Sequence, residues 1–243
     1  MERADPRVAD LVAAGQIRVA LFLPQYAKDA VSGELRGVGT GFIAIEIAHV
    51  LAARLGIEVR LVESPTPPKA VESLKQNACD LAFLGIEPSR AGEVNFSPPL
   101  FQFDYTYLVP AGSTIRSIAD IDRPGICVAV VDSHASALAL RRIVKHAELI
   151  GSELPDTAFE LFSIGKADAF AFPRDQLLDF STKLPGSRVL NDRYGINRVA
   201  MAVAKGRASL LAYVSEFADE GKASGLIEKI IARGALRGFD VAD

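Results

Sequence analysis

The 243-residue chain has no tryptophan and no long run of charge of one sign. It carries 27 lysines and arginines against 30 aspartates and glutamates, a formal net charge of −3. A nucleic-acid surface would be basic and patterned, and a chain with 7% aromatic residues offers no platform for stacking bases. We therefore expect no nucleic-acid partner.

Long hydrophobic runs are also missing. No stretch approaches the roughly 18–20 apolar residues that a membrane-spanning helix needs. The first 16 residues, MERADPRVADLVAAGQ, lack a basic segment followed by an apolar core, so they are not an intact secretion signal. Two readings stay open: a signal has been removed and the protein is periplasmic, or the protein stays in the cytoplasm.

Cysteine is scarce, and motifs for metal chemistry are absent. Cys79 and Cys127 both lie in apolar, strand-like runs, where cysteine usually behaves as a small buried hydrophobe. The chain has no H-E-x-x-H and no C-x-x-C motif, and zinc would need more ligands. We expect no metal, no cofactor and two free thiols.

Apolar runs alternate with helical patterns along the chain, which is typical of an α/β protein with parallel strands. Residues 37–41 form a G-x-G-x-G sequence. It favours a turn over a nucleotide site, because no strand runs directly into it. Strands are expected at residues 17–22, 57–62, 79–86, 103–109, 126–131, 165–172 and 199–204. Helices are expected at residues 42–55, 65–75, 135–149, 208–223 and 224–234.

Arg90 is the first candidate for a binding residue. It follows the apolar run that ends at Gly85, just past Glu87, and open α/β sheets bind ligands beyond the carboxyl ends of their strands. An arginine there can pair with Glu87 or Glu93 as a structural residue, or it can donate both arms of its guanidinium to a ligand carboxylate.

The order of motifs around Arg90 resembles a known family. Arg90 precedes the V-N-F-S-P-P sequence of residues 94–99 and a strand that ends near Ala111-Gly112-Ser113. This order resembles the solute-binding proteins, family 3, that serve polar amino-acid ABC importers. The resemblance covers residues 16–235 and implies a two-lobed type II periplasmic-binding-protein fold with two crossover strands as hinge. The lobes would be 1–103 with 196–243, and 104–195, with one cysteine in each.

The resemblance also implies ligand contacts. Arg90 would clamp the ligand carboxylate, and Tyr26 would supply an aromatic that covers the ligand in the cleft between the lobes. The second half of the clamp would be a helix start at Ser133, His134 and Ala135, with Ser133 as a plausible N-cap. Ala135 stands where the family often has threonine.

Pro173 is the main departure from the family pattern. It stands where amino-acid binders carry an aspartate for the ligand ammonium, with Arg174 and Asp175 beside it. A buried, unpaired ammonium would be costly. The expected ligand is therefore a small carboxylate or amino-acid-like molecule whose α-amino group is absent or not essential.

Function is expected to be that of a non-catalytic, monomeric receptor that presents its ligand to an ABC permease in the membrane. Two alternatives remain. One is a cleft enzyme of the cyclohexadienyl-dehydratase type, which would need a general acid or base, with Glu87, His134 and Asp175 as candidates. The other is a cytoplasmic ligand sensor that never meets a permease.

Overall fold

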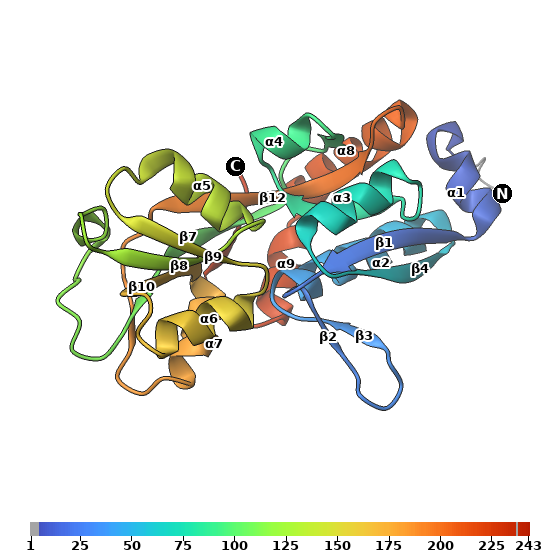
Figure 1. Cartoon of the computed structure of the whole chain (residues 1–243). Helices are drawn as coiled ribbons and strands as arrows, with labels where there is room; N and C mark the ends of the chain where they lie inside the picture. The colour runs from blue at the N-terminus through green and yellow to red at the C-terminus, as the bar shows by residue number, and fades with distance from the viewer. Residues whose placement is uncertain (1–4, 237) are drawn as a thin grey trace. The chain divides into compact units, whose positions relative to one another are not determined.

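The computed structural model describes residues 5–236 and 238–243 and shows two compact units. Unit 1 contains the chain up to Gln102, together with Arg198–Leu236 and Asp240–Asp243. Unit 2 contains Phe103–Asn197 and a short segment that ends at Phe239. Figure 1 shows the elements of both units along the chain. Among the described residues, no helix is both long and apolar enough to span a bilayer.

Unit 1 is built on a mostly parallel sheet. Strand β1 pairs in parallel with β4 on one side and with β5 on the other, and β12 pairs antiparallel with both β5 and β6. All five residues of β5 are buried, which explains its unbroken apolar sequence. The bounds of these strands are β1 Gln16–Phe22, β4 Glu58–Ser64, β5 Leu81–Gly85, β6 Val94–Phe96 and β12 Gly195–Ala204.

Helices and one hairpin complete unit 1. The hairpin joins β2 (Tyr26–Lys28) to β3 (Leu35–Gly37), where the sequence predicted only a loop and a turn. Gly41 is required beside it, because a Cβ there would lie 1.7 Å from the Gln25 carbonyl oxygen. The helices are α1 Ala9–Ala14, α2 Thr40–Leu55, α3 Pro67–Lys75, α4 Pro88–Ala91, α8 Ala208–Ala223 and α9 Leu226–Arg233.

Unit 2 has a sheet in the order β7-β10-β8-β9. Strand β10 is antiparallel to β7 and parallel to β8, and β8 is parallel to β9. The strands are β7 Phe101–Val109, β8 Cys127–Val131, β9 Glu148–Ser152, β10 Ala169–Pro173 and the short β11 Arg188–Val189. The helices are α5 Ala135–Ile143, α6 Pro155–Ser163 and α7 Arg174–Thr182, with a 3-10 turn at Ile118–Asp120.

Hydrophobic clusters lie on both faces of the unit 2 sheet. In β10, Ala169 and Ala171 belong to one cluster, whereas Phe170 and Phe172 belong to the other. Successive side chains of a strand point to opposite faces, so both faces are covered. This is the reason that the sequence of β10 shows no alternation of polar and apolar residues.

The expected helix over residues 135–149 is wrong in its second half. Helix α5 ends at Ile143, and Glu148–Ser152 forms strand β9. The carboxylate of Asp122 accepts backbone hydrogen bonds from Lys145, His146 and Ala147. These bonds hold the pKa of Asp122 below its usual range. The backbone amides that would continue the helix are thus bound by a distant side chain, and the chain turns into a strand.

Candidate functional site

Arg90 lies beyond the carboxyl end of β5, in the short helix α4. The residue is 7% exposed, and its Nη1 donates a hydrogen bond to the carbonyl oxygen of Gly85 at 3.1 Å. Glu93, one of its two candidate partners, instead forms an ion pair with Lys75 at 2.7 Å. Glu87 is buried as the residue before α4. The strand end, the helix and Gly85 together fix a buried guanidinium at the edge of the unit 1 sheet.

Tyr26 is held by its own unit. Its hydroxyl donates to Glu63 Oε1 at 2.9 Å, and Lys28 donates to the other oxygen of Glu63 at 2.8 Å. Burial, followed by the hydrogen bond to Glu63, raises the pKa of Tyr26 to about 12, so the phenol stays protonated. The hairpin strand β2 thus holds the phenol against the end of β4.

His134, not Ser133, caps helix α5. Its Nδ1 accepts a hydrogen bond from the Ser136 backbone amide at 3.2 Å and lies 2.8 Å from the Ser136 hydroxyl. The predicted N-cap was therefore one residue early. Ser136 is fully buried, and its contact with His134 was not predicted. The one sequence signal for this contact is a serine two residues after a possible cap.

Strands β8 and β10 bring two predicted segments of unit 2 to one edge. Because the strands are parallel neighbours, their carboxyl ends meet there: His134 follows β8, and Pro173 ends β10. The His134 ring packs on Phe172, with ring centroids 4.7 Å apart. The Tyr105 ring lies edge-on to the His134 ring, with ring centroids 6.2 Å apart. Ala135, the first residue of α5, is buried.

Asp175, in unit 2, has a carboxyl group with an unusual environment. It lies in the first turn of α7, and its Oδ1 is buried without a hydrogen-bond partner in the described part of the chain. Burial raises the pKa of Asp175 to about 7. Its neighbour Arg174 does not neutralise it, since that guanidinium donates to the carbonyl oxygens of Leu190 and Asn191 at 2.7 and 2.9 Å.

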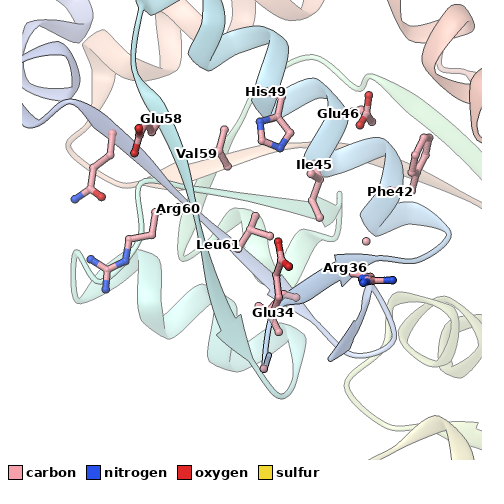
Figure 2. A pocket seen from close by; sticks show the side chains of 14 residues that line it. Glu34, Arg36, Phe42, Ile45, Glu46, His49, Glu58, Val59, Arg60 and Leu61 are labelled. Carbon is pink, nitrogen blue, oxygen red and sulfur yellow. The ribbon is translucent and has the colours of Figure 1, made fainter. Parts of the chain in front are cut away.

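Unit 1 also contains a groove of about 840 Å³, shown in Figure 2. It lies between α2, β4 and the hairpin strand β3, and Tyr26, Gly85, Glu87 and Arg90 are not among the residues that line it. Both apolar and charged side chains line it. The labelled lining residues are Glu34, Arg36, Phe42, Ile45, Glu46, His49, Glu58, Val59, Arg60 and Leu61.

Comparison with known proteins connects the fold to a family. The chain is 26% identical over 212 residues to the glutamine-binding protein GlnH of an ABC transporter of Bacillus subtilis (strain 168), covering 84% of this chain and 74% of the relative. The crystal structure of the solute receptor for L-cysteine of Neisseria gonorrhoeae matches with a TM-score of 0.80 at 22% identity, covering 97% of this chain and 99% of that one.

A second solved structure is the ancestral amino acid-binding protein AncCDT-1, described as a precursor of cyclohexadienyl dehydratase. It matches with a TM-score of 0.76 at 25% identity, covering 93% of this chain and 98% of that one. These likenesses confirm the expected fold class, the two-lobed type II periplasmic-binding-protein fold. Residues 31–233 match the sequence profile of the bacterial extracellular solute-binding proteins, family 3, and the chain belongs to that family.

Proposed function

We propose that this protein is the extracytoplasmic receptor of an ABC importer, which binds a small carboxylate or amino-acid-like molecule and delivers it to a membrane permease. Family membership supports the receptor role. The observation that carries the ligand class is the buried guanidinium of Arg90 at the carboxyl end of β5. Tyr26, Gly85 and Glu87 are the other proposed contacts of unit 1.

Because Arg90 is buried, we expect its guanidinium to bind a ligand carboxylate strongly. A guanidinium donates two parallel hydrogen bonds to a carboxylate, and such charge-assisted bonds are roughly twice as strong as neutral ones. The bond from Nη1 to Gly85 fixes one arm of the fork before the ligand arrives. A guanidinium that is already oriented loses less conformational freedom when the ligand binds.

Unit 2 contributes the proposed contacts Ser133, His134, Ala135 and Pro173. Helix α5 has nine residues, and the free backbone amides at a helix start favour an anionic group. Ala135 carries no hydroxyl, so the backbone has to supply the polar contact there. The side chain of Pro173 carries no charge and no acceptor for an ammonium, which favours a ligand whose α-amino group is absent or not essential.

Titration calorimetry tests this proposal with mono- and dicarboxylates and their α-amino counterparts. Arg90→Ala should lower the affinity about thirty- to several-thousand-fold, because it leaves one partner of a desolvated charge pair unpaired. Arg90→Lys should recover only part of the affinity, since lysine lacks the fork. Arg36→Ala removes an exposed arginine of the same unit and should change nothing.

Two results would overturn parts of this proposal. Normal binding by Arg90→Ala, with an unchanged melting curve, would place the carboxylate elsewhere. Tight binding of an L-amino acid whose deaminated analogue does not bind would refute the ligand class inferred from Pro173.

We propose further that the protein does not catalyse a reaction. Its family consists of solute-binding proteins, and the Nδ1 of His134, one of the three acid–base candidates, has a structural role as the cap of α5. Incubation with a cyclohexadienyl carboxylate should release no carbon dioxide above the rate without protein. The upstream sequence of the gene tests the proposed extracytoplasmic location, because an export signal encoded there would distinguish the receptor from a cytoplasmic sensor.

A further inference from the structure

Strand β4 is the outer strand of the unit 1 sheet, and its free edge has a defined geometry. In the sheet, β1 lies on one side of β4, and no described strand lies on the other side. Gln16 lies opposite Glu58, and the Glu58 amide donates to the Gly15 carbonyl oxygen at 3.0 Å. Backbone groups of successive strand residues point to alternate sides, so Glu58 and Arg60 bond to β1, whereas Val59 and Leu61 present their N–H and C=O groups outward.

The side chains of β4 separate by face. Figure 2 shows Val59 and Leu61 on the side of α2, with Phe42 and Ile45, and Glu58 and Arg60 pointing the other way. Val59 and Leu61 are half-buried, and Glu58 and Arg60 are exposed. In the described part of the chain, Glu58 and Arg60 have no ion-pair partner. The edge thus combines free backbone groups, an apolar stripe and two unpaired, opposite charges.

The charges of Glu58 and Arg60 on one β4 strand are complementary to those on a second, antiparallel β4 strand. In an antiparallel pair of β4 strands centred on Val59, each Glu58 lies opposite the Arg60 of the other copy, so the contact occurs twice. The two Val59 residues then face one another as a hydrogen-bonded pair, because their backbone groups point outward. The Glu58–Arg60 pairs fall at non-hydrogen-bonded positions, where opposed side chains are closest. On the opposite face, Leu61 meets Ile57.

Other registers do not satisfy the charges. Centring the pair on Leu61 would place Arg60 opposite Val62 and Glu58 opposite Ser64, so neither charge would meet its opposite. Glu63, which that register would bring into the contact, already binds Tyr26 and Lys28 of the hairpin. Edge strands protected against pairing usually carry charges that repel a second copy, whereas the charges of β4 attract one in the register centred on Val59.

We propose that a second copy of this chain pairs with the free edge of β4, antiparallel and centred on Val59, to form a weak dimer. Phe42 and Ile45, apolar residues of α2 that line the groove in Figure 2, lie beside this contact. The interface uses Ile57, Glu58, Val59, Arg60 and Leu61, and none of these is a proposed ligand contact. Dimerisation is therefore independent of the proposed receptor function, and ligand binding should not depend on it.

Sedimentation equilibrium over a concentration series, with charge reversal on β4, tests this proposal. Arg60→Glu and Glu58→Arg each replace two attractive pairs with two repulsive ones and should weaken the dimer about tenfold or more. The double variant Glu58→Arg/Arg60→Glu restores opposite charges at both contacts and should return the dissociation constant to the wild-type range. Lys166→Glu, an exposed reversal in unit 2, is the matched control and should leave it unchanged.

Two outcomes would overturn the proposal. One is a wild-type protein that stays monomeric up to millimolar concentration, in agreement with the monomer expected from the sequence. The other is a double variant that remains as weak as the single variants although its circular dichroism and melting curve match the wild type. Affinity for a bound carboxylate, measured on the same variants, should be unchanged in either case.

Discussion

Replacing Asp175 with asparagine should stabilise the protein by an amount that grows as the pH rises from about 4 to 7. The pKa of Asp175 is raised from 3.8 to about 7, mainly by burial and to a smaller extent by the charge of Asp179. Below pH 4 the carboxyl is protonated in both the folded and the unfolded chain, so the shift has no effect on stability. Between pH 4 and 7 the unfolded chain loses this proton while the folded chain keeps it, which lowers stability. Above pH 7 the penalty is constant.

The size of this effect follows from the shift. About three pKa units at 1.36 kcal/mol each give an upper limit of roughly 4 kcal/mol. Because the side chain is only half-buried, we expect about half of this, ~2 kcal/mol, or a rise in Tm of about 4–8 °C for Asp175→Asn at pH 8. An asparagine also leaves a buried polar atom unpaired, but that effect does not vary with pH, so the slope is the measurement.

Melting curves of the wild type and Asp175→Asn at pH 4, 5, 6, 7 and 8 provide the assay. Asp156→Asn is the control, since Asp156 lies in the first turn of α6 and its side chain is 86% exposed. It should show no stabilisation that grows with pH. A difference between Asp175→Asn and the wild type that is equal at pH 5 and pH 8 would refute the assignment of a raised pKa to Asp175.

Two further predictions concern thiols and a helix cap. Under denaturing conditions without reductant, a thiol titration should find both cysteines free; in the native state the half-buried Cys127 should react well before Cys79, which is 1% exposed with its pKa raised to about 12 by burial. Equal native rates would contradict this. Urea unfolding should show a loss of about 0.5–2 kcal/mol for His134→Ala, and an unchanged stability of this variant would contradict the role of His134 as the cap of α5.

Strands β1 and β8 were predictable from the sequence because their mostly buried residues form an apolar run, whereas β9 and the hairpin strands β2 and β3 were not predicted. The expected strand at residues 126–131 became β8, and the one at 17–22 became β1 with a difference of one residue at its start. The boundaries of helix α5 were not predictable in the same way. Asp122 ends that region through hydrogen bonds to amides 23 to 25 residues away, and a local pattern cannot contain such a contact.

The place of Arg90 in the fold was predictable, whereas its contacts were not. Arg90 could be placed at the end of β5 from the apolar run before it, but its burial and its bond to Gly85 depend on the folded chain. Tyr26 was placed by resemblance, whereas its hydroxyl partner Glu63 lies 37 residues further along. Cys79 and Cys127 were expected in different lobes and lie in different units, both as free thiols.

The adjacent charges of Arg174 and Asp175 show why the chemistry of unit 2 could not be assigned from sequence. Neighbouring opposite charges suggest mutual neutralisation, but Arg174 binds the carbonyl oxygens that follow β11, and it also lies 3.6 Å from the Asp104 carboxylate. Asp175 keeps a buried oxygen that no described residue satisfies. Burial raises the pKa of this carboxyl more than the backbone amides of Gln176 and Asp175, which donate to it, lower that pKa. The unsatisfied oxygen therefore favours a carboxyl that takes up a proton or receives a donor from outside the chain. The pH dependence of stability, measured without ligand, therefore shows which of the two occurs. This result is needed before the inference from Pro173 about a ligand's amino group is extended to Asp175.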